Sequence, residues 1–377
     1  MNSVEIRKNI LSNVRRIVVK LGSSVVTTDK GLDRKIIRGL SDEICAYNKL
    51  GKEFIIVSSG AVAAGVRRMT LKEGARTIPQ KQAAASVGQS RLMAAYEEAF
   101  SRHGSRVGQM LLTRDDLANR RRYLNARNTL MTLLSWGVTP IINENDTVVV
   151  DEIKLGDNDN LSALVAVLAS ADLLLTLTDM DGLMDCDPRV NPNACLIPVV
   201  EDLTPEIMGY AGGSSSSIGR GGMTSKLEAA KKVRMSGVPM IIAKGKTARL
   251  ISHVLEGEMI GTLVLPAKEK ISARKHWIRY NLKPEGDLYV DAGAARAIIQ
   301  KGKSLLPIGV LRIEGEFEDG SAVRILSPEG VPLAVGLINY SSNEMIKIIG
   351  RQTPEIDWVL GYRSNDEAVH ADNLVIL

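Results

Sequence analysis

Short runs of β-branched and apolar residues alternate with longer amphipathic stretches between residues 17 and 265. Six of these runs predict buried strands, at residues 17–21, 54–58, 107–112, 139–143, 173–177 and 240–243. The stretches between them predict helices, among them residues 79–103, 121–136, 158–171 and 223–235. This alternation is typical of βαβ units, so we expect an α/β domain with a mainly parallel sheet.

The first of these units also carries helix-end signals. Asp33 precedes apolar residues that recur at helical spacing, and Gly51 follows the last of them. A short acidic side chain suits a helix N-cap, and glycine suits the position just beyond a helix C-terminus. We therefore expect a capped helix between the first two strands.

The pattern changes after residue 265. A charged segment bounded by proline and glycine follows, and beyond it short apolar runs at 287–291, 308–313, 322–326 and 333–339 are separated by turn residues. We expect a first domain at residues 1–270, a connector at 271–283, and a small, mostly β domain at 284–377.

Composition fits this organisation. The chain has 377 residues, of which 45% are hydrophobic, 24% charged and 4% aromatic, which excludes a disordered or fibrous protein.

The longest apolar run, residues 161–178, is interrupted by Ser162, Ser170 and Asp172, so we expect no membrane span. The N-terminal residues are too polar for a signal-peptide core, and three cysteines without metal-ligand spacing suit reduced thiols. We therefore expect a cytoplasmic protein.

The net charge of +5 is unevenly distributed. Residues 1–270 carry 36 Lys and Arg against 29 Asp and Glu, whereas residues 271–377 carry 12 against 14. So small a basic surplus fits an anionic small molecule at least as well as a nucleic-acid backbone. Because the C-terminal part is slightly acidic and has no array of stacking aromatics, RNA binding is not expected.

Two common nucleotide-binding motifs are absent. The sequences ending in Gly245-Lys246-Thr247 and Gly302-Lys303-Ser304 lack the first glycine of a Walker A loop. The Gly219-Arg220-Gly221 segment lacks the third glycine of a dinucleotide fingerprint and follows no strand directly. Neither of the first two segments is therefore a Walker A loop, and the sequence does not support a Rossmann dehydrogenase.

Polar, glycine-marked segments instead follow several predicted strands, where ligands of open α/β sheets collect. Residues 19–24 place Lys20 near the end of a buried strand, before Gly22 and two serines, which suits an anion; the alternative is an edge-strand lysine that reaches solvent. Residues 57–62 form a Ser-Gly turn in which Ser59 could bind substrate or simply cap a helix.

Residues 143–160 are unusually rich in polar side chains. They contain four carboxamides and six carboxylates in eighteen residues, more than helix capping requires, although Asp157 or Asn158 could simply be a cap. Such groups can bind an ammonium ion or organise the cations of a phosphate site.

Two further segments complete the set. Residues 176–183 form an acidic turn after a strand, which could equally be an ordinary Asp-Gly turn. Residues 219–226 place glycines, hydroxyls and Lys226 before an amphipathic helix, where donors would face an anion; the alternative is a flexible Gly-Ser loop. Since the chain has no Ser-His-Asp order and no catalytic Cys context, these segments together favour phosphoryl transfer.

The same segments resemble the amino acid kinase family. VVKLGSS, SSGAVAAG, VGQMLLTR, LNARNTL, PIINENDTV, EIKLGDNDNLSA, LTDMDGL and GRGGMTSK occur in the order of that family. The resemblance covers residues 16–266, and the remaining residues resemble a PUA domain. It implies a three-layer sandwich with a mainly parallel central sheet, followed by a small, mostly β domain.

The resemblance also implies roles for individual residues. Lys20 and Lys226 would flank the transferred phosphoryl group, and Asp157 and Asp159 would hold these lysines and help to place Mg²⁺. The positions that match the acceptor site of the family are Ser59, Asp146 and Asn158, with Asp146 as a partner for an α-ammonium group. The positions that match its ATP-binding segments are Lys20, Gly22, Thr178, Asp179, Arg220, Gly221, Gly222, Met223, Thr224, Ser225 and Lys226.

The implied reaction transfers the γ-phosphate of ATP to the γ-carboxylate of L-glutamate, as the first step of proline biosynthesis. The resemblance further implies inhibition by proline, with residues 145–154 as a regulatory loop, a homo-oligomer, and transfer of the unstable acyl phosphate to glutamate 5-phosphate reductase. Arg220 departs from the family, which commonly has a small hydroxyl residue there, so it either contacts phosphate or points to solvent. Ser58 likewise replaces a common threonine.

Two alternatives remain at this stage. A related kinase with another acceptor, such as aspartate, acetylglutamate, carbamate or UMP, would keep the ATP-binding segments and change the acceptor segments. A PUA-containing RNA-binding protein is the alternative from another class.

Overall fold

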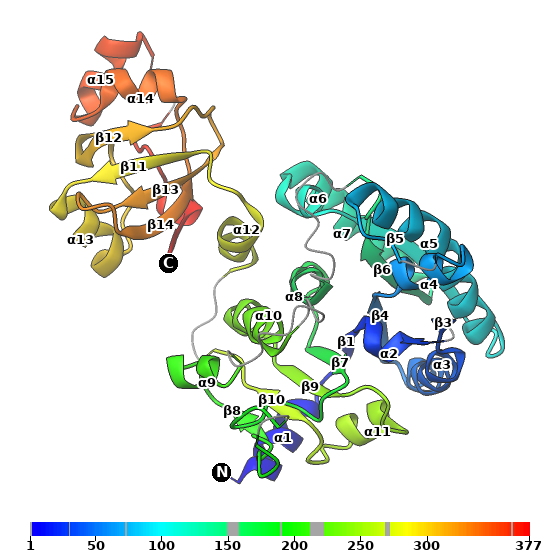
Figure 1. The fold of residues 1–377 in the computed structure, drawn as a ribbon. Coiled ribbons are helices and arrows are strands. Elements are labelled where there is room, and N and C mark those ends of the chain that lie inside the picture. Colours follow the sequence, from blue (N-terminus) through cyan, green and yellow to red (C-terminus); the bar gives the residue numbers. More distant parts are fainter. Residues whose placement is uncertain are drawn as a thin grey trace. The chain divides into compact units, whose positions relative to one another are not determined.

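The computed structural model describes residues 2–29, 31–71, 74–148, 158–188, 191–211, 222–267, 272–362 and 365–377. The chain divides into two compact units, Met1–Lys270 and Ile271–Leu377, drawn as ribbons in Figure 1. Each unit has its own sheet and its own buried apolar core. Within the described ranges, no helix has the length and apolar character needed to cross a membrane.

The first unit contains an eight-stranded sheet in the order β5-β6-β4-β1-β7-β9-β10-β8. Its strands are β1 (Arg16–Leu21), β4 (Glu53–Ser58), β5 (Arg106–Leu112), β6 (Val138–Glu144), β7 (Leu173–Thr178), β8 (Val199–Val200), β9 (Met240–Lys244) and β10 (Thr262–Val264). The six strands from β5 to β9 pair in parallel, and β10 is antiparallel to β9. A separate hairpin joins β2 (Thr27–Thr28) to β3 (Gly31–Leu32).

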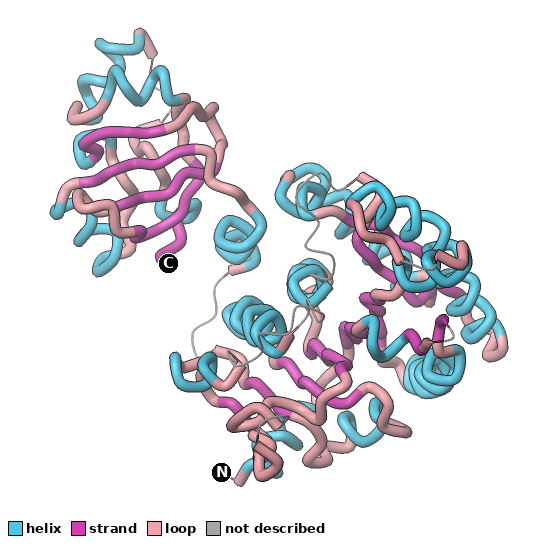
Figure 2. Tube along the Cα trace, viewed as in Figure 1, coloured by secondary structure: helices cyan, strands magenta, loops and turns pink. Residues whose placement is uncertain are grey.

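Helices cover both faces of this sheet, as Figures 1 and 2 show. They are α1 (Ser3–Leu11), α2 (Ser23–Val26), α3 (Arg34–Lys49), α4 (Ala61–Arg68), α5 (Ile78–Ser101), α6 (Arg114–Ala118), α7 (Arg120–Ser135), α8 (Asn158–Leu168), α9 (Pro205–Gly209), α10 (Met223–Met235) and α11 (Leu250–Leu255). The three-layer α/β fold implied by the family resemblance is therefore confirmed.

Strand alternation in β1 assigns its side chains to the two faces. Ile17, Val19 and Leu21 belong to the core that α3, α5 and α11 share with the sheet. The side chain of Lys20 lies on the opposite face, because successive side chains of a strand point to opposite sides. That face is covered by α8 and α10, so Lys20 is directed toward these two helices.

Helices α4 and α5 pack in direct backbone contact. A Cβ atom at Gly65 would lie 1.7 Å from the Ala84 carbonyl oxygen, and one at Gly88 would lie 1.8 Å from the Ala61 carbonyl oxygen. Only glycine permits such an approach at either position. This contact fixes α5 against the start of α4, directly after β4.

The second unit is built on a five-stranded sheet in the order β12-β11-β13-β14-β15. Its elements are α12 (Ala273–Asn281), β11 (Gly286–Val290), α13 (Ala292–Lys301), η1 (Pro307–Gly309), β12 (Val310–Glu314), β13 (Ala322–Leu326), β14 (Pro332–Leu337), α14 (Ser342–Ile348), α15 (Thr353–Leu360), η2 (Ala371–Asn373) and β15 (Leu374–Ile376). All strand pairs are antiparallel except β11 with β13. The predicted small domain with a mainly strand sheet is confirmed.

The predicted elements agree with the observed ones to within a few residues at their ends. The Asp33 carboxylate accepts hydrogen bonds from the backbone N–H groups of Lys35 and Ile36, as expected of an N-cap, and Gly51 has a φ of 81° just beyond α3. Residues 271–283, expected as a connector, contain α12, which contacts β14 and β15 of the second unit.

Candidate active site

The predicted site residues lie at the carboxyl ends of adjacent parallel strands. In the sheet, β1 lies between β4 and β7, and β4 pairs with β6. Lys20 and Gly22 come from the end of β1, Ser59 follows β4, and Thr178 ends β7. Parallel pairing brings these ends to one edge of the sheet, so residues far apart in sequence become neighbours.

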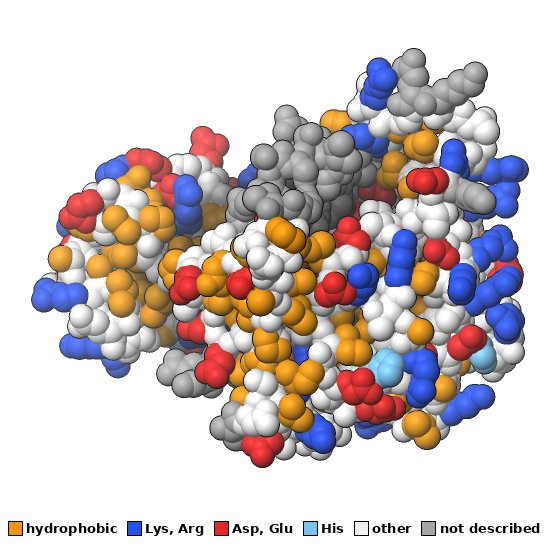
Figure 3. All heavy atoms as spheres, turned by 60° about the horizontal axis from the view of Figure 1, so that its bottom comes forward, with side chains coloured by type: hydrophobic (Ala, Val, Ile, Leu, Met, Phe, Trp, Pro, Cys, Tyr) orange, Lys and Arg blue, Asp and Glu red, His pale blue; other side chains and the backbone are white. Residues whose placement is uncertain are grey.

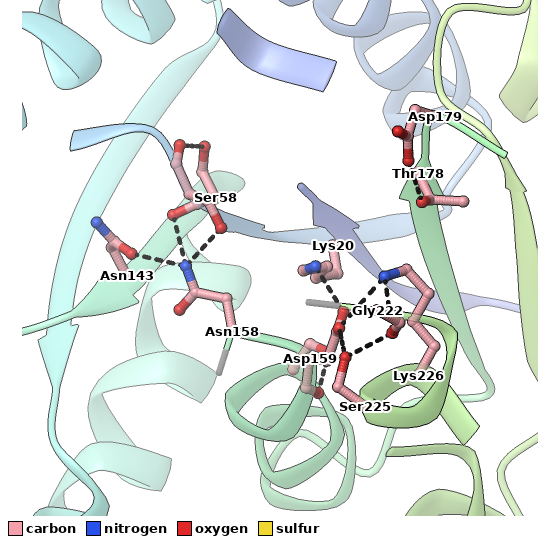
Figure 4. Close-up of polar contacts among 12 residues, drawn as sticks. Lys20, Ser58, Asn143, Asn158, Asp159, Thr178, Asp179, Gly222, Ser225 and Lys226 are labelled. Atoms are coloured by element: carbon pink, nitrogen blue, oxygen red, sulfur yellow. Dashed lines mark hydrogen bonds and ion pairs between the residues drawn. The ribbon is translucent and has the colours of Figure 1, made fainter. Parts of the chain in front are cut away.

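A charged cluster joins β1, α8 and α10 (Figure 4). Lys20 Nζ lies 2.5 Å from Asp159 Oδ1, and Lys226 Nζ lies 3.5 Å from Asp159 Oδ2. Ser225 Oγ donates a hydrogen bond of 2.6 Å to the same Oδ2 atom. Two ammonium groups that are 206 residues apart thus converge on one carboxylate.

This cluster is withdrawn from solvent. Lys20 and Lys226 are each 4% exposed, and Asp159 is fully buried. Burial opposes ionisation of Asp159, but the charges of Lys20 and Lys226 and the hydrogen bonds from Lys20 and Ser225 outweigh it and hold the pKa of its carboxyl below the usual range. Burial, with the charge of Lys20, lowers the pKa of Lys226 despite Asp159. Two ammonium groups therefore meet at one buried carboxylate, and the charge of Asp179 also acts to raise the pKa of Lys226.

The start of helix α10 lies beside this cluster. Helix α10 begins after Gly222, which has no side chain to cap the first N–H groups. Lys226 Nζ and Ser225 Oγ both donate to the Gly222 carbonyl oxygen, at 3.4 and 2.8 Å. A Cβ atom at Gly22 would lie 3.9 Å from Lys20 Nζ, at van der Waals distance, so the backbone of Gly22 lies directly beside this ammonium group. Free N–H groups at a helix N-terminus bind phosphate readily.

A neutral cluster lies on the other side of the α8 N-terminus (Figure 4). Asn158 Nδ2 donates to Ser59 Oγ at 2.7 Å, to Asn143 Oδ1 at 3.1 Å and to the Ser58 carbonyl oxygen at 3.4 Å. Asn143 Nδ2 in turn donates to Gln89 Oε1, on α5, at 2.9 Å. The predicted acceptor-site residues Ser59 and Asn158 are therefore in direct contact.

The remaining predicted residues differ in their surroundings. Thr178 is buried and donates to the exposed Asp179 at 3.0 Å. Met223 is the first residue of α10, and the exposed Thr224 donates to the Ala211 carbonyl oxygen at 3.1 Å. Asp157, Arg220 and Gly221 lie outside the described residues, as does most of the predicted regulatory loop.

Asp146 is half-buried two residues after β6. Among the residues that the structure describes, no hydrogen bond or ion pair joins it to Ser59 or Asn158. Burial raises the pKa of its carboxyl to about 6. The carboxyl therefore changes charge close to physiological pH, which makes its predicted pairing with an ammonium group testable.

Sequence reasoning did not single out Gln89, Asn143 or Tyr96. Ser58 Oγ forms a hydrogen bond of 2.9 Å with the Tyr96 hydroxyl on α5, where burial raises the pKa of the phenol. Asn143 lies within residues 143–160, whose high polar content does not distinguish it from its neighbours. The available signal for Gln89 was its position beside Gly88, a glycine inside an otherwise regular helix.

Metal-ligating side chains gather elsewhere. Among the described residues, only His253, Glu256 and Glu258 bring three such groups within 4.8 Å of one another, and none of them belongs to the predicted site. Within the site, Asp159 supplies the hard oxygen atoms that Mg²⁺ prefers, but both are engaged by cations or a hydroxyl of the chain.

Comparisons with known proteins identify the family of this chain. The model of the amino acid kinase family matches residues 15–244, and that of the PUA domain matches residues 286–360. Glutamate 5-kinases of Citrifermentans bemidjiense and Geobacter sp. (strain M21) are each 55% identical to this chain over 372 residues, covering 98% of it and 100% of the relative. The glutamate 5-kinase of Geobacter sulfurreducens is 52% identical with the same coverage.

The chain therefore belongs to the amino acid kinase family and is a kinase with an appended PUA domain. Within that family it belongs, over nearly its full length, to the glutamate 5-kinases.

Proposed function

We propose that this protein transfers the γ-phosphate of ATP to the γ-carboxylate of L-glutamate, giving glutamate 5-phosphate and ADP, in the cytoplasm and as the first step of proline biosynthesis. The observation that carries the proposal is the convergence of Lys20 and Lys226 on Asp159. The relatives that are similar to this chain over nearly its full length are glutamate 5-kinases, which supports glutamate as the acceptor.

In the proposed reaction, a γ-carboxylate oxygen of glutamate attacks the γ-phosphorus, and the bond between this phosphorus and the β,γ-bridging oxygen breaks. Lys20 and Lys226 stabilise the negative charge on the transferred oxygens, and the N–H groups at the start of α10 bind the phosphates. Asp159 holds both ammonium groups in place through its two oxygens.

Magnesium is the proposed metal, bound together with ATP. Asp159 and the preceding Asp157 would help to position it, and when bound it neutralises part of the triphosphate charge. The acceptor is held by the neutral cluster around Ser59 and Asn158, with Asp146 as a partner for the α-ammonium group.

Regulation and assembly follow the family resemblance. We propose that proline inhibits by acting at or near the glutamate site and that residues 145–154 take part. We further propose that the chain forms a homo-oligomer and that the acyl phosphate passes to glutamate 5-phosphate reductase. RNA is not a proposed ligand. On the face drawn in Figure 3, Lys and Arg side chains lie interspersed with Asp and Glu, which does not favour a polyanionic backbone.

A panel of acceptors tests the proposal. The purified protein is incubated with MgATP and with glutamate, aspartate, acetylglutamate, carbamate or UMP, while ADP release is followed. Hydroxylamine in parallel reactions converts an acyl phosphate into a stable hydroxamate, which identifies a carboxylate acceptor. We expect ADP and hydroxamate with glutamate; turnover with another acceptor but none with glutamate would contradict the proposal.

A further inference from the structure

The carboxamides of Asn158, Asn143 and Gln89 form a hydrogen-bond chain with a fixed direction. A carboxamide has a donor end and an acceptor end. The Ser58 carbonyl oxygen can only accept, and it lies 3.4 Å from Asn158 Nδ2. The nitrogen of Asn158 is therefore directed toward the end of β4, and its Oδ1 atom is directed away from it.

The orientation of Asn158 determines the orientation of the next two carboxamides. Because Asn158 presents its nitrogen, Asn143 must accept through Oδ1, at 3.1 Å. Asn143 then has only its nitrogen left, which donates to Gln89 Oε1 at 2.9 Å. Gln89 is the last residue of this series of hydrogen bonds. Its acceptor oxygen stabilises the orientation of both asparagines.

This orientation leaves one hydrogen-bond acceptor of Asn158 without a partner among the described residues. Asn158 Oδ1 is buried and has no hydrogen-bond partner among the described residues. The residue itself is 6% exposed, so water has little access to it. A buried acceptor without a donor costs free energy, which a ligand that supplies a donor would recover.

The ligand group that fits is an ammonium ion. Both carboxylates of glutamate only accept hydrogen bonds, so the α-ammonium group is its one donor. We propose that Gln89 is a positioning residue, which acts through Asn143 to hold Asn158 Oδ1 toward the α-ammonium group of the substrate. This inference rests on the proposed function, because it takes an α-amino acid as the acceptor.

The packing of α5 makes Gln89 a fixed support. Its neighbour Gly88 lies in backbone contact with Ala61, immediately after the turn that carries Ser59. The Gln89 side chain therefore starts from a helix that cannot move independently of this turn. A substitution that keeps the length of the side chain should leave the α4–α5 contact intact.

The test compares glutamate with glutarate, which has the same two carboxylates and no ammonium group. In Gln89→Met the side chain keeps its length but cannot accept from Asn143. We expect the KM for glutamate to rise about tenfold, with kcat and the KM for ATP little changed, because one charge-assisted hydrogen bond is weakened. The inhibition constant of glutarate, measured by competition with glutamate, should stay constant.

Two further variants distinguish a positioning role of Gln89 from a non-specific disturbance of the substrate site. Gln89→Glu keeps an oxygen that accepts from Asn143. The ratio of the glutarate inhibition constant to the glutamate KM, which should fall in Gln89→Met, should therefore not fall below the wild-type value in Gln89→Glu. Ser90→Ala, on the exposed side of α5, should change neither constant. If Gln89→Met weakens both ligands equally, or leaves the glutamate KM unchanged, the inference is wrong. Lack of glutamate turnover by the wild-type protein would instead overturn the proposed function.

Discussion

Asn158 and Asp159 are adjacent at the start of α8, yet their side chains belong to two clusters of opposite character. Asp159 is fully buried between two ammonium groups from β1 and α10. Asn158 lies in a neutral network of serine and carboxamide groups from β4, β6 and α5. Figure 4 shows the two side chains diverging from the same helix turn.

The difference suggests a division of labour across one helix N-terminus. Negative charge on a transferred phosphoryl group is stabilised best by fixed positive charges. An amino acid that carries both signs of charge is distinguished better by donors and acceptors at defined positions, because unmatched polar groups exclude the wrong ligand. Changes in the charged cluster should therefore alter stability and kcat, and changes in the neutral cluster should alter the KM for glutamate.

The largest expected effect is on stability, from Asp159→Asn. This change leaves two buried ammonium groups without their shared counter-charge, and breaking a buried ion pair typically costs about 3–5 kcal/mol. The lowered pKa of Asp159 means that its contribution is complete above the unfolded pKa of about 4 and is lost only as the pH falls through the folded value. Urea unfolding at pH 7 measures the loss.

ATP should restore part of this stability, because a triphosphate supplies the missing negative charge and binding favours the folded state. Glu98→Gln is a suitable control: Glu98 also pairs with two cations, Arg34 and Arg38, but on the surface. We expect a far smaller change there, since exposed ion pairs contribute little. Equal stability of Asp159→Asn and the wild-type protein would show that the charged cluster is not coupled as described.

The next largest effect is on turnover, from Lys226→Ala. Removing one group that stabilises transition-state charge typically lowers kcat by about 10²–10³-fold. The KM for glutamate should change little, because Lys226 pairs with Asp159 of the charged cluster. Lys231→Ala, on the exposed side of the same helix, should retain wild-type kinetics. Unimpaired turnover of Lys226→Ala would refute the role assigned to this lysine.

The two clusters also differ in how far the sequence predicts them. The strand pattern places Lys20 at the carboxyl end of a buried strand, whereas the pairing of Lys20 with Lys226, which lies on a helix, was implied only by the family resemblance. Contacts between Gln89 and Asn143 and between Tyr96 and Ser58 were not predicted. They depend on how closely α5 approaches α4, which is set by glycine contacts and not by the polar pattern.

A pH-dependent effect is expected at Asp146, the proposed partner of the α-ammonium group. Burial raises the pKa of this carboxyl to about 6, so about nine-tenths of it is protonated at pH 5. If the carboxylate pairs with the α-ammonium group, the KM for glutamate should rise as the pH falls below 6. Asp146→Asn should show a KM about tenfold higher at pH 8, with a weaker dependence on pH. Steady-state kinetics between pH 5 and 8 test this; an unchanged KM would place the ammonium group elsewhere.

The smallest effect is expected for Ser59→Ala, which removes one of three acceptors around Asn158 Nδ2. Loss of one neutral hydrogen bond, about 1 kcal/mol, corresponds to a rise of about fivefold in the KM for glutamate, with kcat unchanged. The adjacent Ser58 is the matched control, because its hydroxyl pairs with Tyr96 and not with Asn158. Ser58→Ala should lower the free energy of unfolding, since the buried Tyr96 hydroxyl loses its partner, and should affect the KM less than Ser59→Ala does. If the two variants behave alike, the neutral cluster contributes to packing rather than to recognition of the acceptor.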